Sequence, residues 1–495
     1  MKLYKSTLLL LFLICCGPVR AQRSCGIEAE KAAMIARDSS WVRRFDEQRA
    51  SLQSIADNYK KMMGSHSLER VSSTVAPVPV IFHIIVDTQQ YMNMGGEGGI
   101  IRRVDSQIVV LNRDYNCQNA DSSMIPSSWK ALYSPVGVHF ALAHTDPNGK
   151  STPGYEILTT DYQFTAGPYN DYSDAKSAIN GLAGWDDTRY MNVWCISFSD
   201  NPGLLGITCP KSFTVGSGAE PAADEGVCIN YLALGCQTVP ASLNFPSGGN
   251  YSEGRTLTHE VGHFFEIWHT WGDDRGLCPW QTPVPCPNGG DPTLSGVGYD
   301  DGLGDTPPEG DHQYGNPAYT IPGGTYYDCC EYNPNVAGGP NMQPIGIASL
   351  SFINYTDDDA MHMFTADQAA AMASMVLVPP SGVTGATGSG TVGESYSLTQ
   401  NPGLLDYPSV GITNFDVYPN PSPATGNLTV TFDSSSDKLV EIQLTNAIGQ
   451  LAAKYEVTGT QAHYYTFPIT GLAAGIYFIR CTFASGIVTR KISIK

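Results

Sequence analysis

The sequence predicts an α+β domain, built from a mixed sheet and a histidine-bearing helix, followed by a small all-β sandwich. Three observations carry this prediction. Apolar strand segments and an amphipathic helix precede the run HEVGHFFEIWH, which begins at His259. Helices and strands in this order are typical of an α+β domain with a mixed sheet. After residue 412, short alternating segments are separated by turn residues, which is the pattern of a small sandwich.

The elements of the first domain are expected in chain order. The segment VPVIFHIIV at residues 78–86 is typical of a buried strand, and His83 within it is expected to be an ordinary core or edge residue. Residues 101–115 carry apolar side chains on one face and predict an amphipathic helix. The remaining elements are strands at 136–143 and 191–198, the histidine helix at 253–268, an irregular stretch at 270–345 and a closing helix at 365–375.

Composition divides the chain into five parts. Residues 1–21 have the basic start, short apolar run and small residues of a secretory signal peptide, and the run is too short to span a membrane. Residues 22–75 are charged and helix-favouring, and they occupy the position of a pro-segment. The first domain then covers residues 76–376, a Gly-, Ser-, Thr- and Pro-rich linker covers 377–412, and the sandwich covers 413–495.

The chain is acidic, with a formal net charge of −19 over 495 residues. This charge argues against nucleic acid and anionic membranes as partners, and it suits a secreted protein. Of 13 cysteines, Cys15 and Cys16 would leave with the signal, although that stretch also allows a weak lipoprotein signal. The other eleven are expected to form disulfides, with at least one left unpaired. They are Cys25, Cys117, Cys195, Cys209, Cys228, Cys236, Cys278, Cys286, Cys329, Cys330 and Cys481.

The histidine run has the spacing of a metal site. His259 and His263 are four residues apart and share one face of a helix. His269 would lie about 15 Å from His259 along a continuous helix, so the helix must end and the chain fold back. Glu266 is the alternative third ligand, but at about 10.5 Å along the axis it is too far, and His269 is preferred. Three imidazoles and one open position are typical of catalytic zinc, whereas the plain alternative is a surface helix with histidines.

The segment RTLTHEVGHFFEIWHTWGDD resembles the zinc segment of the pappalysin-type (cytophagalysin-like) metzincin zinc metalloproteases. PVIFHIIV, SQIVVLNRDY, DGLGDTPPE and FINYTDDDAMHMF also fall in the family's order, and the resemblance covers about residues 76–375. NFDVYPNPSPATGNLTV and GLAAGIYFIR resemble the C-terminal sorting domain of type IX secretion. The resemblance implies a metzincin-like catalytic domain, export across both membranes of a Bacteroidetes-type bacterium, protein or peptide substrates, and the type IX machinery as a partner.

The sequence departs from the family pattern at three positions. Glu266 stands where the long zinc signature has Gly, and a left-handed Glu costs roughly 1–2 kcal/mol. Ile353 stands where the family has the Met that packs below the histidines, and an apolar residue of similar volume should cost little. Ala360 stands where a cysteine is common, which puts one family disulfide in doubt.

The resemblance also implies roles for single residues. His259, His263 and His269 would hold Zn²⁺, Glu260 would be the general base, and Tyr355 would donate to the oxyanion unless it is only a packing residue. Cys25 is either half of a disulfide or a switch whose thiolate closes the zinc site. Asp301 and Asp305, with Asp273 and Asp274, offer oxygen ligands for calcium, or are solvated loop carboxylates.

Two further functions remain open from the sequence. One is a catalytically weakened surface binding or adhesion protein that keeps the metzincin fold, for which Glu266 and Ile353 are the support. The other is a structural zinc site, but such sites are closed by four protein ligands, and only three ligands and a base are found in the run. The secreted zinc endopeptidase is therefore the leading prediction.

Overall fold

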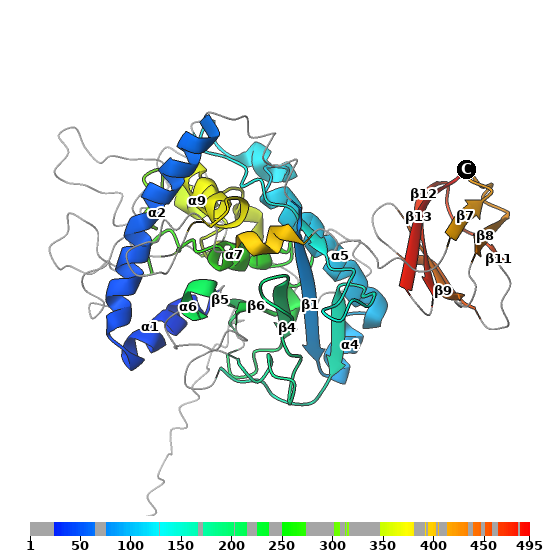
Figure 1. The fold of residues 1–495 in the computed structure, drawn as a ribbon, viewed down its shortest axis with the longest axis horizontal. Coiled ribbons are helices and arrows are strands. Elements are labelled where there is room, and N and C mark those ends of the chain that lie inside the picture. The colour runs from blue at the N-terminus through cyan, green and yellow to red at the C-terminus, as the bar shows by residue number, and fades with distance from the viewer. Residues whose placement is uncertain are drawn as a thin grey trace, which may run out of the picture.

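A computed structural model gives the fold of the chain (Figure 1). It describes residues 24–64, 76–127, 129–166, 172–201, 203–214, 225–236, 250–273, 301–306, 347–380, 395–401, 413–433, 439–446, 451–457, 464–483 and 486–495, with a few single residues between these ranges. The expected signal peptide, Asp274, and Cys278, Cys286, Cys329 and Cys330 lie outside the described residues.

The N-terminal segment folds into two helices, α1 (Ile27–Arg37) and α2 (Ser40–Gly64). Apolar side chains recur along one face of α2, where Phe45, Leu52 and Ile55 are at most 5% exposed. They belong to the same core as the histidine helix, so the segment is part of the folded domain. Figure 1 shows α2 as a long helix beside α9 at one side of this domain. That residues 22–75 are a pro-segment stays a prediction.

A six-stranded mixed sheet forms the frame of the first domain. The strands are β1 (Val78–Val86), β2 (Phe140–Leu142), β3 (Tyr155–Thr159), β4 (Met191–Ile196), β5 (Gly206–Cys209) and β6 (Gly226–Asn230). Their order is β2-β1-β4-β6-β5, with β3 also paired to β1. All pairs are parallel except β5 with β6, so the edge strand β5 is antiparallel. The mixed sheet predicted from the sequence is confirmed.

Helices and short helical turns alternate with the strands, and one of them carries His259 and His263. These elements are α4 (Thr88–Asn93), α5 (Gly96–Asp114), η1 (Ala120–Met124), α6 (Lys211–Thr214), η4 (Tyr231–Ala233), α7 (Arg255–Phe264), α8 (Ile347–Leu350), η5 (Asp358–Ala360) and α9 (Ala366–Leu377). The helix predicted at 101–115 begins five residues earlier, at Gly96, because the Gly-rich residues before 101 are also helical. The predicted strand at 136–143 is shorter, since only Phe140–Leu142 pairs with β1.

The expected linker is partly packed against the first domain. Residues Tyr396–Gln400 form a short helix, η6, and Leu398 is buried in the main core. Leu404 is also buried, and its carbonyl accepts a hydrogen bond of 2.7 Å from the amide of His144. Within the expected linker, Leu398 and Leu404 thus pack against apolar partners, and the assignment of residues 377–412 as a linker stays a prediction.

The C-terminal unit is a sandwich of antiparallel sheets, as the sequence predicts. Its strands are β7 (Thr413–Tyr418), β8 (Asn427–Asp433), β9 (Leu439–Asn446), β10 (Leu451–Glu456), β11 (Tyr464–Pro468), β12 (Gly475–Phe483) and β13 (Gly486–Ile494). One sheet has the order β10-β9-β12-β13 and the other β11-β8-β7. Inward residues of both sheets, such as Val430 and Ile479, share one core.

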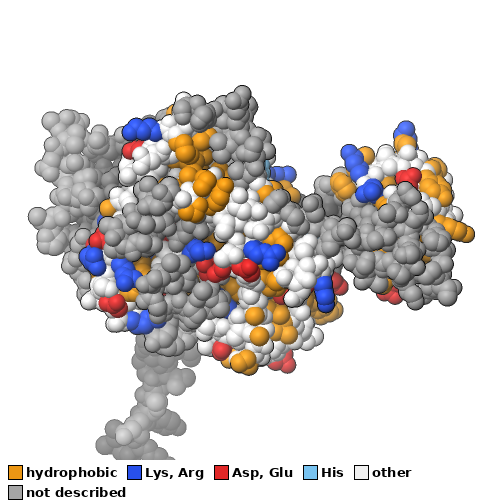
Figure 2. Space-filling view, in the orientation of Figure 1, with side chains coloured by type: hydrophobic (Ala, Val, Ile, Leu, Met, Phe, Trp, Pro, Cys, Tyr) orange, Lys and Arg blue, Asp and Glu red, His pale blue; other side chains and the backbone are white. Residues whose placement is uncertain are grey.

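The described cysteines correct one expectation. Cys25, Cys117, Cys195, Cys228 and Cys481 carry free thiols, so the prediction that they form disulfides is wrong. Four of the five are buried, and Cys195, Cys228 and Cys481 act as small apolar side chains in the cores. Within the described residues, none of the helices combines the length and the apolar character needed to cross a bilayer. Figure 2 shows charged side chains of both signs scattered over one face of the protein.

Candidate metal centre and active site

Helix α7 carries the first two histidines and is buried along its whole length. Its first residue, Arg255, is a buried cation that ties the helix to neighbouring segments. The Arg255 guanidinium donates 2.6 Å to the backbone oxygen of Asp358 and lies 2.6 Å from a carboxylate oxygen of Asp121. A paired and hydrogen-bonded buried charge of this kind fixes the helix start in the domain. Its position in turn fixes the direction in which His259 and His263 point.

The chain reverses directly after α7, as the position of His269 requires. The helix ends at Phe264, four residues before the predicted end at 268. Glu266 takes a left-handed conformation with φ of 69°. The amide of Ile267 then donates to the Gly262 carbonyl at 3.1 Å, which closes the turn. Glu266 therefore adopts the conformation that Gly favours in the long zinc signature, and the predicted strain is present.

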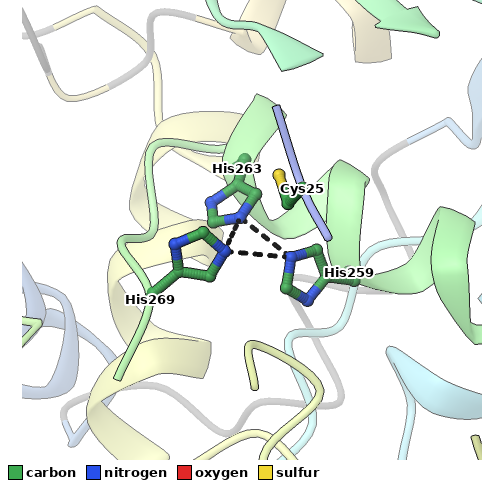
Figure 3. A group of neighbouring side chains, drawn as sticks. All are labelled: Cys25, His259, His263 and His269. Carbon is green, nitrogen blue, oxygen red and sulfur yellow. Dashed lines mark hydrogen bonds between the residues drawn. The ribbon is translucent and has the colours of Figure 1, made fainter. Parts of the chain in front are cut away.

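The three histidines meet at one point (Figure 3). The Nε2 atoms of His259 and His263 lie 3.1 Å apart, those of His263 and His269 3.1 Å, and those of His259 and His269 3.2 Å. Nitrogen ligands at tetrahedral positions around zinc would be about 3.3 Å apart. The predicted ligands His259, His263 and His269 are thus brought together at close to the spacing that zinc requires.

The other ring nitrogen of each histidine is held by an acceptor. Nδ1 of His259 donates to the carbonyl of Phe352 at 2.8 Å, and Nδ1 of His263 donates to the carbonyl of Ile267 at 2.7 Å. Nδ1 of His269 donates to the carboxylate of Asp273. Since these acceptors place a hydrogen on every Nδ1, each neutral ring presents an Nε2 lone pair to the centre. Burial and the nearby His269 ring hold the pKa of His263 well below its usual range. Three converging lone pairs fit a cation.

Ile353 lies under the metal helix. A Cβ added to Gly262 of α7 would overlap Cδ1 of Ile353, so the two residues are in close contact. Ile353 is fully buried, and it follows Phe352, whose carbonyl holds His259. The expectation that an apolar residue replaces the family's methionine as the floor of the site agrees with this position. Met361 and Met363, which are also buried, occupy other places in the core.

Glu260 is buried beside the three histidines and faces the edge strand β5. Its Oε2 accepts a hydrogen bond of 2.6 Å from the hydroxyl of Thr208. Gly206 lies so close that an added Cβ would overlap the Glu260 carboxylate. Strand β5 therefore contacts the Glu260 carboxylate at Thr208 and at Gly206. Only a Gly at position 206 leaves room for this carboxylate.

Tyr355 also faces the site. Its ring centroid is 5.0 Å from that of His269 and 6.0 Å from that of His259. Burial raises the pKa of Tyr355 well above its usual range, so the hydroxyl stays protonated and can donate. The amide of Cys25 donates to this hydroxyl at 3.1 Å, and the hydroxyl lies 3.3 Å from the carboxylate of Glu28. The hydroxyl of Tyr355 thus points into the site, which is more than a tyrosine with only a packing role requires.

Cys25 enters the site from the N-terminal segment. Residues 24–26 lie along β5: the amide of Leu205 donates to the Ser24 carbonyl at 3.0 Å, and the amide of Gly26 donates to the Gly206 carbonyl at 2.8 Å. The Cys25 thiol and the three histidine rings each offer a ligand atom within 4.8 Å of one another. Burial, together with Glu260, raises the pKa of the Cys25 thiol. A thiolate here therefore needs the cation that the histidines are built to hold.

Glu266 has a second structural role besides its turn. Its carboxylate accepts hydrogen bonds from the amide of Ser212 at 3.1 Å and from the hydroxyl of Ser212 at 2.7 Å. The side-chain amide of Gln48 on α2 donates to the same carboxylate. Burial raises the pKa of Glu266 to about 7. The residue that departs from the family's Gly thus links the metal domain to the N-terminal segment.

The calcium candidates do not form one group. Asp301 accepts hydrogen bonds from Thr306 at 3.1 Å and Gln368 at 2.8 Å. Asp305 accepts from Thr365 at 2.7 Å. Asp273 instead binds His269 and Lys31. Among the described side chains, the groups that could hold a metal include neither Asp301 nor Asp305, and calcium there stays a prediction.

Sequence reasoning missed several residues that hold the site. Thr208 and Gly206 come from β5, which no sequence pattern connects with Glu260. Lys31 and Gln48 are ordinary polar residues of a helical segment until the fold brings them to the metal domain. Only Asp273 carried a local signal, because it is four residues beyond His269.

Comparisons with known proteins agree with this fold. Residues 416–495 match the family model of the secretion system C-terminal sorting domain. An extracellular metalloprotease of Arthroderma benhamiae is 28% identical over 238 residues, which are 46% of this chain and 63% of that protein. One from Arthroderma gypseum is 27% identical over 286 residues, which are 55% of this chain and 72% of that protein. The chain thus spans less than two thirds of the first of these relatives.

A solved structure gives the same picture of the fold. A promirolysin mutant of Tannerella forsythia matches with a TM-score of 0.51 and 24% identity, over 77% of this chain and 98% of that one. The chain therefore joins a mixed-sheet domain, with three converging histidines, to a C-terminal sorting domain of a secretion system. In particular, the chain has the fold of promirolysin and carries the sorting domain of type IX export, which directs it to the cell surface or the extracellular space.

Proposed function

We propose that this protein is a secreted zinc endopeptidase of the pappalysin type, and that residues 22–75 hold it latent. The observation that carries this proposal is the convergence of three Nε2 lone pairs, 3.1–3.2 Å apart, beside the carboxylate of Glu260. The names of the curated relatives, extracellular metalloproteases, support the same reaction. The substrates would be proteins or peptides, and the type IX machinery would be the export partner.

The residues present fit a zinc site, in which His259, His263 and His269 would be the ligands. When bound, zinc supplies the Lewis acidity that polarises the scissile carbonyl and makes water a nucleophile near neutral pH. Glu260 accepts the proton of the attacking water and delivers it to the leaving amine. Thr208 orients the Glu260 carboxylate for this transfer, because its hydroxyl donates to Oε2.

Tyr355 would stabilise the charge that develops on the carbonyl oxygen. Its hydroxyl stays protonated because burial raises its pKa, and a protonated hydroxyl beside the histidines can donate to an oxyanion. In the full chain this hydroxyl is engaged by Cys25 and Glu28. The N-terminal segment therefore occupies the positions that a substrate carbonyl would need.

Latency follows from the place of Cys25. Its thiolate would be the fourth protein ligand and would convert an open catalytic site into a closed one. The same residue lies against Glu260, and the segment lies along β5, where an extended substrate would pair. Removal of residues 22–75 would thus free the metal position, the base, the tyrosine and the strand edge together.

Two of the three departures from the family pattern, Glu266 and Ile353, have structural roles in this account. Glu266 takes the left-handed turn conformation and binds α2, and Ile353 fills the floor below α7. They therefore give little support to the alternative, a catalytically weakened binding protein.

Metal exchange tests the proposal. The protein with its N-terminal segment released should cleave unfolded casein, lose this activity with 1,10-phenanthroline, and regain it when zinc is added. Magnesium and calcium should not restore it, because three imidazoles favour zinc over hard cations. Activity that survives complete zinc removal would refute the proposal.

A further inference from the structure

Tyr355 lies in a cluster of aromatic rings that belong to the metal domain. Its ring centroid is 4.8 Å from that of Trp271 and 4.9 Å from that of His312, and the centroids of Trp271 and His312 are 5.3 Å apart. The three rings therefore contact one another. Trp271 is in turn stacked on His269, with ring centroids 4.3 Å apart. Aromatic pairs at such separations stabilise one arrangement of their rings beyond the burial of apolar area.

The backbone holds His312 beside Tyr355. Three residues after His312, Gly315 pairs in parallel with Thr356, the neighbour of Tyr355. The carbonyl of Gly315 also accepts a hydrogen bond of 2.8 Å from the amide of Asp357. These contacts are made within the metal domain and not by the N-terminal segment. They therefore keep His312 against Tyr355 when that segment leaves.

The hydroxyl of Tyr355 is held differently from its ring, because it contacts the N-terminal segment. In the full chain it lies 3.1 Å from the amide nitrogen of Cys25 and 3.3 Å from a carboxylate oxygen of Glu28. Release of the segment removes both contacts. An oxyanion donor must lie about 2.7–3.1 Å from the oxyanion, whereas the staggered rotamers of a side chain differ by about 120°. After release, the neighbouring rings must therefore hold Tyr355 in the one rotamer that serves the reaction.

His312 closes the ring cluster on its outer side. Trp271 and Tyr355 are at most 1% exposed, whereas His312 is half-buried and its neighbour in the cluster, Tyr314, is 37% exposed. The ring of Tyr314 packs on that of His312, with centroids 4.3 Å apart. Trp271 is thus fixed in the core, and the free space into which the Tyr355 ring can turn lies on the side of His312.

We propose that His312 is a positioning residue, whose ring keeps the hydroxyl of Tyr355 directed into the site after the N-terminal segment leaves. This inference rests on the proposed function, in which Tyr355 donates to the oxyanion. The role needs a flat ring at position 312, because the contacts of His312 with Trp271 and Tyr355 are made ring to ring. His312 thus acts on the reaction through Tyr355.

A kinetic double-mutant cycle on the activated protein tests this role. His312→Ala should lower kcat roughly tenfold and keep KM within about twofold, because two ring contacts are lost while the substrate still binds. His312→Phe, which retains a flat ring, should keep kcat within about twofold of the parent. His139→Ala, a histidine exchange at an exposed position, is the control and should change neither constant.

The cycle is completed in Tyr355→Phe, which lacks the hydroxyl. There His312→Ala should have no further effect on kcat, because no donor is left to position. An equal loss of kcat in both backgrounds would overturn the proposal. So would a loss in His312→Phe as large as that in His312→Ala.

Binding of a phosphinic peptide repeats the cycle without turnover. Its tetrahedral phosphinyl group resembles the oxyanion intermediate, so its dissociation constant responds to the Tyr355 hydroxyl. Calorimetry should show roughly tenfold weaker binding by His312→Ala than by the parent, and no such loss in the Tyr355→Phe background. Zinc content should be equal in all variants. This pattern without casein cleavage would support the positioning role and refute the peptidase. A loss of equal size in both backgrounds would refute the positioning role.

Discussion

The thiol of Cys25 lies 3.5 Å from Oε2 of Glu260 in the buried site between β5 and α7. One residue of the N-terminal segment therefore meets both the three histidines and the carboxylate proposed as the base. A covered base and a closed metal position each suffice to prevent peptide hydrolysis. In the proposed function, this contact lets a single side chain keep the exported chain inactive until its N-terminal segment is removed.

The Cys25→Ala chain should show more peptidase activity than the parent before its segment is removed, because no thiolate can then close the metal position, although the segment still lies along β5. It should also lose the segment by self-cleavage sooner than the parent. Casein cleavage and gel analysis of the freshly purified full chain would measure both effects. Cys117→Ser, a thiol exchange away from the site, is the control. If Cys25→Ala stays as inactive as the parent, the switch is refuted.

Gln48→Leu should loosen the segment without touching the site. It removes the donor that α2 gives to the buried carboxylate of Glu266, which should cost roughly 1–3 kcal/mol of unfolding free energy. Urea denaturation of the full chain would measure this loss. Gln89→Leu, which alters an exposed amide pair on α4, should stay within about 0.5 kcal/mol of the parent. Equal stabilities of the two variants would contradict the role assigned to Gln48.

Gly262→Ala should destabilise the metal helix, because the new methyl group overlaps Cδ1 of Ile353. Overpacking of this kind costs roughly 1–3 kcal/mol. Ile353→Val removes that Cδ1 and should restore part of the loss in the double variant. A double-mutant cycle should then show a coupling of at least about 0.5 kcal/mol. Strictly additive effects would mean that the two residues are not in contact.

Asp114 gives the stability a pH dependence with a defined sign. Burial raises its pKa from 3.8 to about 7 in the folded chain, despite the opposing Arg255. Between about pH 4 and 7 the folded chain therefore holds a proton that the unfolded chain has lost. The contribution of Asp114 to the free energy of unfolding is complete at low pH. It is lost as the pH rises to 7, by up to about 1.4 kcal/mol per pH unit. Unfolding free energies of Asp114→Asn should fall less over this range than those of the parent. Identical pH profiles would contradict the raised pKa.

The sequence predicted the parts of this protein that have a local pattern. Strand β1 was found at its predicted bounds because all its residues except His83 are apolar. The three histidines that meet in the structure were singled out because helix periodicity and the rise per residue leave few choices. The sandwich followed from alternation and turn residues.

The rest depends on contacts between segments far apart in the chain. Thr208 meets Glu260 from an edge strand of only four residues, which has no signal of its own. Lys31 and Gln48 are exposed on an isolated helix and buried only in the folded domain. The expected disulfides failed for five cysteines, because export predicts bridges from composition, whereas the fold leaves these five thiols free and buries four of them.

Glu260→Ala tests the central claim most directly. Parent and variant would be purified with the N-terminal segment removed, and zinc content and casein cleavage would be measured on the same samples. The account predicts equal zinc in both and cleavage by the parent only, because Glu260 moves protons and does not hold the metal. Cleavage by Glu260→Ala at the parent rate, with zinc bound in both, would contradict the account.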